Sequence, residues 1–216
     1  MSTTKPSAEV VTVEKLAAAK RIPADALRSF GLADVAEGVR FDYRQADGTP
    51  ARPRLRTAMR GADGSVWSSE SSLPISVYTA PPDVTPAVDP ESLIIVEGES
   101  DCWSAWLHGV AALGIPGPTQ FDKLELKHVE PFAAVYLLRE PAPVDSPTYA
   151  NGVETYLRNV QSRLKEIGYA GQVFELTMPD GLFDLSELHQ HDPQQFLPRL
   201  TRAKQAAQPL HNRPSE

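Results

Sequence analysis

Cysteine is almost absent from this sequence of 216 residues, since Cys102 is the only one. A single cysteine excludes an intramolecular disulfide and any zinc site built from four cysteines. No apolar run approaches the roughly 18 residues of a membrane-spanning helix. Residues 1–10 also lack the apolar segment of a secretory signal. We therefore expect a cytoplasmic protein with no membrane partner.

A positive net charge is also missing, because the formal net charge is −7. Residues 1–90 hold 11 basic and 11 acidic residues, whereas residues 91–216 hold 10 basic and 17 acidic ones. Within the first part, only Asp42 and Asp47 accompany a run of arginines: Arg40, Arg44, Arg52, Arg54, Arg56 and Arg60. This charge distribution is consistent with a protein that binds a polyanion at its basic surface, beside an acidic surface that binds metal. It is equally consistent with a hairpin whose arginines are simply exposed to solvent.

Residues 1–80 are predicted to form a small helical and β-hairpin region. The segment 12–31 has the spacing of two short helices, with Pro23 at the start of the second and Gly31 at its end. Residues 39–59 alternate around the turn "DGTP", which is typical of a β-hairpin. Residues 81–90 are rich in proline and are predicted to be a linker between two domains.

From residue 91 to residue 207 the pattern becomes one of apolar strands alternating with helices. Four apolar runs predict strands, at 93–96, 111–116, 133–138 and 172–176, and helical spacing appears at 100–110, 152–168 and 192–207. This alternation predicts an α/β fold with a parallel sheet flanked by helices. Residues 208–216 are predicted to be a tail.

Three of the predicted strands end close to an acidic residue. Glu97 and Glu140 follow their strands almost directly, and Asp184 follows the last strand after a short loop. The functional residues of parallel α/β sheets lie just past the carboxyl ends of the strands, so these acids can converge on one crevice. Converging carboxylates repel one another unless a cation lies among them, and Mg²⁺ prefers oxygen ligands. The alternative is that each acid lies separately in a solvated loop.

The order of these motifs resembles a Toprim domain, over about residues 91–207. The resemblance is carried by "LIIVEGESD" (93–101), "GVAALGIPG" (109–117), "REP" (139–141) and "FDLSELH" (183–189). Toprim domains occur in bacterial-type primases, type IA and II topoisomerases and some nucleases. The resemblance is strongest to the primase-like Toprim proteins of phages, plasmids and other mobile elements.

This resemblance implies a role for each acid. Glu97 matches the glutamate that acts as general acid or base in phosphoryl transfer, and Asp101 matches the second acid of the same motif. Glu140 and Asp184 match acids that bind Mg²⁺ or Mn²⁺. Where the family has another acid two positions after the first, this chain has Ala142, and Asp145 is the candidate replacement.

The implied function is that of a DNA primase, which makes RNA primers from nucleotides on single-stranded DNA. Arg52, Arg54 and Arg56 would contact the nucleic acid, and a replicative helicase is a candidate partner. One alternative is a Toprim nuclease that hydrolyses phosphodiesters with the same acids. Another is a non-catalytic nucleic-acid-binding or adaptor protein, which Ala142 favours.

Four smaller expectations concern the segment that follows Glu97. Gly98 is expected to allow the sharp turn from strand to helix, and Ser100 to cap the helix. Glu99 is expected to face solvent. The aromatic side chains of Trp103 and Trp106 are expected to pack in the core.

Overall fold

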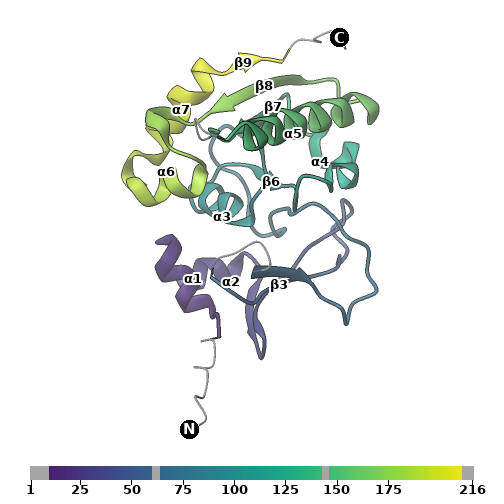
Figure 1. Ribbon diagram of the computed structural model, residues 1–216, viewed down its shortest axis with the longest axis vertical. Helices are drawn as coiled ribbons and strands as arrows, with labels where there is room; N and C mark the ends of the chain where they lie inside the picture. Colours follow the sequence, from purple (N-terminus) through teal and green to yellow (C-terminus); the bar gives the residue numbers. More distant parts are fainter. Residues whose placement is uncertain (1–9, 60–63, 143–145, 211–216) are drawn as a thin grey trace.

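The computed structural model describes residues 10–59, 64–142 and 146–210. Its first part holds two helices and one antiparallel sheet (Figure 1). The elements are α1 (Val13–Lys20), α2 (Ala24–Ser29), β1 (Leu32–Val35), β2 (Gly38–Phe41), β3 (Arg54–Arg56) and β4 (Ser65–Trp67). The strands lie in the order β1-β2-β3-β4. The predicted helices and hairpin are therefore present, and β1 and β4 widen the hairpin on both sides.

The second part is an alternating α/β layer. It contains β5 (Ser92–Val96), α3 (Glu99–Leu107), β6 (Ala112–Gly114), α4 (Leu126–Val129), β7 (Ala134–Arg139), α5 (Pro147–Glu166), β8 (Gln172–Thr177), α6 (Leu185–His191), α7 (Phe196–Ala206) and β9 (Gln208–Pro209). Short 3₁₀ turns lie at Phe121–Lys123, Pro179–Gly181 and Pro193–Gln195. The sheet order is β6-β5-β7-β8-β9, in which only β9 runs antiparallel to its neighbour.

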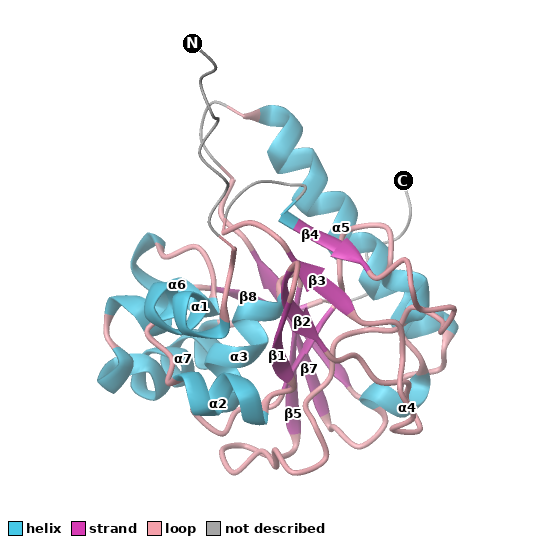
Figure 2. Ribbon diagram, turned by 90° about the horizontal axis from the view of Figure 1, so that it is seen from below, coloured by secondary structure: helices cyan, strands magenta, loops and turns pink. Residues whose placement is uncertain are grey.

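Helices cover both faces of this sheet, as Figure 2 shows, with α3, α6 and α7 on one side and α4 and α5 on the other. Alternate residues of β5 explain the arrangement. Ile94 and Val96 pack in the core cluster that includes α3, α6 and α7, whereas Leu93 and Ile95 pack in the cluster of α4 and α5. A strand covered on both faces has no polar side, which is why its sequence is a continuous apolar run.

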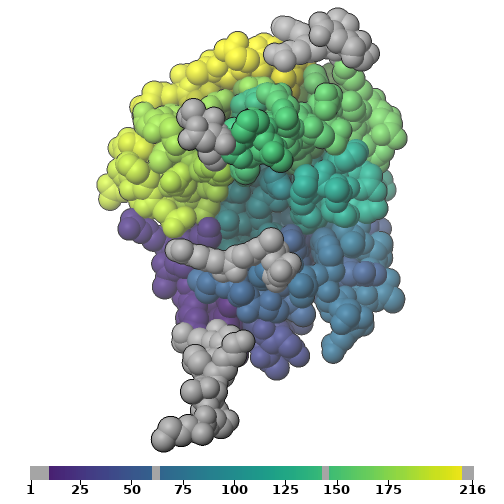
Figure 3. All heavy atoms as spheres, in the orientation of Figure 1, coloured from purple at the N-terminus to yellow at the C-terminus, as the bar shows by residue number. Residues whose placement is uncertain are grey.

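The antiparallel sheet packs directly against the α/β layer, and the two are continuous in the space-filling view (Figure 3). Phe41 of β2 lies edge-on to Trp103 of α3, with ring centroids 5.2 Å apart. Tyr43 packs on Tyr78 at 4.7 Å, and Tyr78 packs on Trp106 at 5.1 Å. The expectation that both tryptophans lie in the core is confirmed.

The predicted linker, residues 81–90, is in contact with the core. Val84 and Val88 pack against the shared apolar cluster, and Val88 forms a parallel β-bridge with Val110. The backbone N–H groups of Ala87 and Val88 both donate to the carbonyl of Gly109. The domain boundary at this segment stays a prediction.

Three helices differ from the expectation, and one of them, α4 (Leu126–Val129), was not predicted at all. The helix α5 begins at Pro147 rather than at residue 152, because proline suits the first turn and Asn151-Gly152 continues the helix. The helix α6 is too short for its periodicity to be visible, and its sequence signal is the N-cap Asp184. None of the described helices is long and apolar enough to cross a membrane.

Candidate functional site

The acids named from the sequence line one pocket of about 510 Å³ at the carboxyl ends of β5 and β7. Glu97 follows β5, Glu140 follows β7, and Asp184 precedes α6. Asp101 reaches the pocket from the first turn of α3, and Arg54 borders it from β3. The structure therefore brings four of the five predicted acids together. The fifth, Asp145, lies outside the described residues.

Gly98 turns the chain from β5 into α3 and is the N-cap of that helix. A Cβ atom at this position would lie 2.9 Å from Oδ2 of Asp101. The glycine thus lets the Asp101 carboxylate approach the backbone closely. The predicted cap, Ser100, instead lies inside the helix, so that expectation is wrong.

Asp101 is the most deeply buried acid of the pocket, at 3% exposure. Its Oδ1 accepts a 2.9 Å hydrogen bond from the backbone N–H of Ser186, in the first turn of α6. Burial and then the charge of Asp184 raise the pKa of the Asp101 carboxyl well above its ordinary value. Asp101 therefore joins α3 to α6, and its carboxyl holds a proton more tightly than an exposed aspartate does.

The carboxylates of Glu97 and Glu140 repel each other within the pocket. Burial, followed by the charge of Glu140, raises the pKa of Glu97. Burial also raises the pKa of Glu140, and the charge of Asp184 adds to this, while a hydrogen bond from Tyr149 opposes it. The Tyr149 hydroxyl donates to Oε2 of Glu140 at 2.5 Å. Partly buried carboxylates that repel one another hold their protons more tightly than exposed ones.

Asp184 caps helix α6 and also lines the pocket. Its Oδ1 accepts a 2.6 Å hydrogen bond from the backbone N–H of Glu187 and so caps α6. One carboxylate oxygen is thereby committed to the helix. The second oxygen is the one available for a ligand in the pocket.

The chemistry of this donor set fits a hard divalent cation, since it consists of carboxylate oxygens that repel one another. Within residues 10–59, 64–142 and 146–210, no group of three or more His, Cys, Asp or Glu side chains is already gathered in metal-binding geometry. Ala142, which stands where the Toprim pattern has an acid, is exposed. Metal binding by Glu140 and Asp184 stays a prediction.

Glu99 does not face solvent, contrary to the expectation. It accepts hydrogen bonds from the Tyr43 hydroxyl at 2.7 Å and from the Arg54 guanidinium at 2.8 Å. Its side chain is only 13% exposed, and that of Arg54 is 20% exposed. The sequence concealed this contact because the partners are far apart in the chain: Arg54 lies in β3, whereas Glu99 begins α3.

The three arginines of the predicted nucleic-acid surface lie in different settings. Arg54 borders the acid pocket, and its buried Nε finds no hydrogen-bond partner among the described residues. Arg52 donates from Nε to the carbonyl of Leu73 at 2.9 Å, and Arg56 donates to Oγ of Ser65 at 3.0 Å. Arg52 and Arg56 do not line the pocket.

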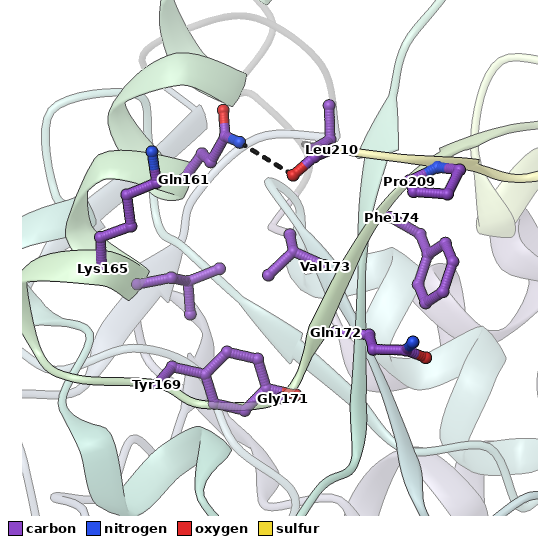
Figure 4. Close-up of a pocket in the computed structure, with 10 residues that line it drawn as sticks. Gln161, Lys165, Tyr169, Gly171, Gln172, Val173, Phe174, Pro209 and Leu210 are labelled. Atoms are coloured by element: carbon purple, nitrogen blue, oxygen red, sulfur yellow. Dashed lines mark hydrogen bonds between the residues drawn. The ribbon is translucent and has the colours of Figure 1, made fainter. Parts of the chain in front are cut away.

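Another pocket, of about 470 Å³, lies between α5 and β8 (Figure 4). Its single charged lining residue is Lys165, and Gln161 donates to the carbonyl of Leu210 across it at 3.3 Å. No carboxylate lines this pocket. Of these two pockets, the one at Glu97 has the groups that could bind a cation or transfer a proton.

Comparisons with solved structures match this fold to primases. The DnaG primase catalytic domain bound to single-stranded DNA has a TM-score of 0.60 at 16% identity, and the match covers 85% of this chain and 58% of that one. The E. coli primase catalytic core gives 0.58 at 17% identity, with 86% and 60% covered. The Aquifex aeolicus primase, with zinc-binding and RNA polymerase domains, gives 0.54 at 14% identity, with 93% and 51% covered.

These likenesses confirm the predicted fold class, a Toprim-like α/β fold with a smaller N-terminal α+β region. At such low identity they concern the fold alone. The chain spans between 51% and 60% of the length of these structures. No family model and no curated protein matches the sequence.

Proposed function

We propose that this chain is a Toprim-type DNA primase that joins ribonucleotides into RNA primers on single-stranded DNA. The main support is that four acids line one pocket of a fold similar to primase catalytic domains: Glu97, Asp101, Glu140 and Asp184. One of those domains is bound to single-stranded DNA, which supports the proposed template. The sequence resemblance supports the mobile-element branch and a replicative helicase as partner.

Glu97 is the proposed proton acceptor. In primer extension, the 3′-hydroxyl of the RNA forms a bond to the α-phosphorus of a nucleoside triphosphate. The bond from that phosphorus to the leaving pyrophosphate breaks, and the hydroxyl proton passes to a base. Burial and the nearby Glu140 charge raise the pKa of Glu97, which makes its carboxylate a stronger base than an exposed one.

Glu140 and Asp184 are the proposed holders of Mg²⁺ or Mn²⁺, and Asp145 is a further candidate. A divalent cation bound there would neutralise triphosphate charge and polarise a phosphoryl oxygen. Tyr149 would keep Glu140 oriented through its hydrogen bond to Oε2. Asp101 would hold the start of α6, and with it Asp184, in place.

Arg54 is the proposed phosphate contact inside the pocket. Its Nε–H is a buried donor without an acceptor among the described residues, and a phosphate oxygen of the template or nucleotide would supply one. Arg52 and Arg56 would contact the template outside the pocket. Because binding to phosphates releases counterions, each lost contact is expected to reduce the salt slope for single-stranded DNA by about 0.7.

A product assay tests the proposal. The protein is incubated with end-labelled single-stranded DNA and ribonucleotides carrying a second label, with Mg²⁺ or Mn²⁺ and, as the control, with a chelator. We expect labelled RNA that lengthens with time, a full-length template and no product with the chelator.

The other outcomes separate the remaining functions. Shortened template without RNA identifies a nuclease and contradicts the primase proposal. DNA binding without either product leaves the non-catalytic binding role, and it also overturns the proposed activity.

A further inference from the structure

The hydroxyl of Tyr156 is a buried donor that has no acceptor. Tyr156 lies on α5, is 5% exposed, and packs in the core cluster with Leu93 and Leu137. Its Oη atom finds no hydrogen-bond partner among the described residues. The same side chain lines the acid pocket, beside Glu97.

Each of the other well-buried tyrosine hydroxyls among the described residues takes part in a hydrogen bond. Tyr43 donates to Glu99, and the hydroxyl of Tyr78 accepts from the indole N–H of Trp103 at 2.9 Å. The half-buried Tyr169 donates to the carbonyl of Phe132 at 2.9 Å. At least one hydrogen bond is therefore the pattern for these hydroxyls, and Tyr156, which makes none with the described residues, departs from it.

The departure has an energetic consequence. A buried hydroxyl without a partner costs about 1–3 kcal/mol, and phenylalanine would fill nearly the same space without that cost. Packing alone therefore favours phenylalanine at this position. Uncompensated polar groups in native cores concentrate where function requires them.

Glu97 is a partly buried carboxylate of the same pocket. Its carboxylate receives no hydrogen bond from the described residues, and only burial and the charge of Glu140 act on its pKa. After burial, the Glu97 charge is the largest influence that raises the pKa of the Tyr156 phenol. Among the described residues, a hydroxyl without an acceptor and a carboxylate without a protein donor thus border the same pocket.

We propose that Tyr156 positions Glu97, by donating a hydrogen bond to its carboxylate when substrate occupies the pocket. This inference rests on the proposed function, since it assigns Tyr156 to the step in which Glu97 accepts a proton. A hydrogen bond from the rigid helix α5 fixes the orientation of the Glu97 carboxylate toward the attacking hydroxyl. Tyr156 acts through Glu97 and is a positioning residue, not a catalytic one.

The test compares Tyr156→Phe with Tyr169→Phe, which removes a hydroxyl remote from the pocket. Urea unfolding measures stability, titration calorimetry with Mn²⁺ measures nucleotide binding, and primer extension gives kcat and KM. For Tyr156→Phe we expect unchanged or greater stability, unchanged nucleotide affinity and KM, and a kcat lower by about 10- to 100-fold. For Tyr169→Phe we expect lower stability and an unchanged kcat.

A spectroscopic measurement adds a readout that does not depend on turnover. With 3-fluorotyrosine incorporated at position 156, the ¹⁹F resonance should shift when nucleotide and Mg²⁺ are added. The shift should be reduced in Glu97→Gln, because a neutral amide is a weaker acceptor than a carboxylate.

The outcomes distinguish this inference from the proposed function. A wild-type protein that makes no RNA overturns both. Active wild type with an undiminished kcat in Tyr156→Phe overturns the positioning role alone. A Tyr156→Phe variant that loses stability together with kcat also overturns it, because the hydroxyl would then have a structural partner.

Discussion

The Arg54 guanidinium donates a 2.8 Å hydrogen bond to the Glu99 carboxylate and so ties β3 to the first turn of α3. The Tyr43 hydroxyl donates to the same Glu99 oxygen at 2.7 Å. Arg54 and Glu99 both border the acid pocket. The pocket is therefore built across the junction between the antiparallel sheet and the α/β layer, and the N-terminal region is part of the site.

Breaking this ion pair should destabilise the protein. Arg54→Met leaves a mostly buried Glu99 carboxylate without its charged partner, and the loss is expected to be about 1.5–3 kcal/mol. Glu99→Gln keeps an acceptor for both donors and should lose less. Urea unfolding measures the free energies.

The exposed Glu166, paired with Arg163, provides the control: Glu166→Gln should change stability by no more than about 0.5 kcal/mol. Equal losses in Arg54→Met and Glu166→Gln would contradict this account.

Asp101 should make stability depend on pH. Its pKa is raised in the folded protein, chiefly by burial and then by the Asp184 charge, so the folded state binds this proton more tightly than the unfolded state. The tighter binding of this proton adds to the free energy of unfolding. This stabilisation is complete below the unfolded pKa of about 3.9 and is lost as the pH rises through the folded pKa.

Asp101→Asn removes this dependence while keeping an oxygen that can accept from Ser186. The free energy of unfolding of the variant, minus that of the wild type, should therefore increase from acid to neutral pH. Denaturant titrations at several pH values measure the difference, with the exposed Asp122→Asn as control. A difference that stays constant or shrinks with rising pH would show that the carboxyl is not perturbed in this way.

Divalent cations should stabilise the wild-type fold. A ligand that binds only the folded state at 100 times its Kd adds about 2.7 kcal/mol, which a rise in Tm reports. Glu140→Gln should lose most of this response to Mg²⁺ and Mn²⁺. In the absence of cations, the same variant should be as stable as the wild type or more stable, because it removes a carboxylate that repels Asp184. A full cation response in Glu140→Gln would exclude that residue as a ligand.

Two glycines of the pocket should respond to alanine with opposite signs. At Gly98 a Cβ would lie 2.9 Å from the Asp101 carboxylate, so Gly98→Ala should cost about 1–3 kcal/mol through overpacking. At Gly152, inside α5, a Cβ meets nothing within 4 Å, and Gly152→Ala should stabilise by about 0.4–1 kcal/mol. Thermal unfolding measures both, and the same sign for both would contradict the geometry.

The fold was predictable where single residues carry a strong local signal. The apolar run 93–96 indicated a strand covered on both faces, and β5 is such a strand. Glu97 and Glu140 could be placed in one pocket because they follow neighbouring parallel strands. The helix α6 escaped prediction because seven residues are too few to display a helical period.

Contacts between distant parts of the chain were not predictable. Glu99 looked like a solvated residue because its partner, Arg54, is 45 positions away. Tyr156 looked like one more apolar position of α5, and nothing in the sequence indicated that its hydroxyl would lack a hydrogen-bond partner among the described residues. Such features arise from packing between elements, on which local sequence patterns carry no information.

Primer synthesis by Glu97→Gln is the most direct test of the proposal that Glu97 accepts the proton during RNA synthesis. The variant is assayed beside the wild type and the control variant Glu166→Gln. Each protein is given single-stranded DNA, ribonucleotides and Mg²⁺, and the labelled RNA is quantified. We expect RNA synthesis by the wild type and by Glu166→Gln, and a rate lower by about 100-fold or more in Glu97→Gln. Undiminished RNA synthesis in a folded Glu97→Gln protein would contradict the proposal.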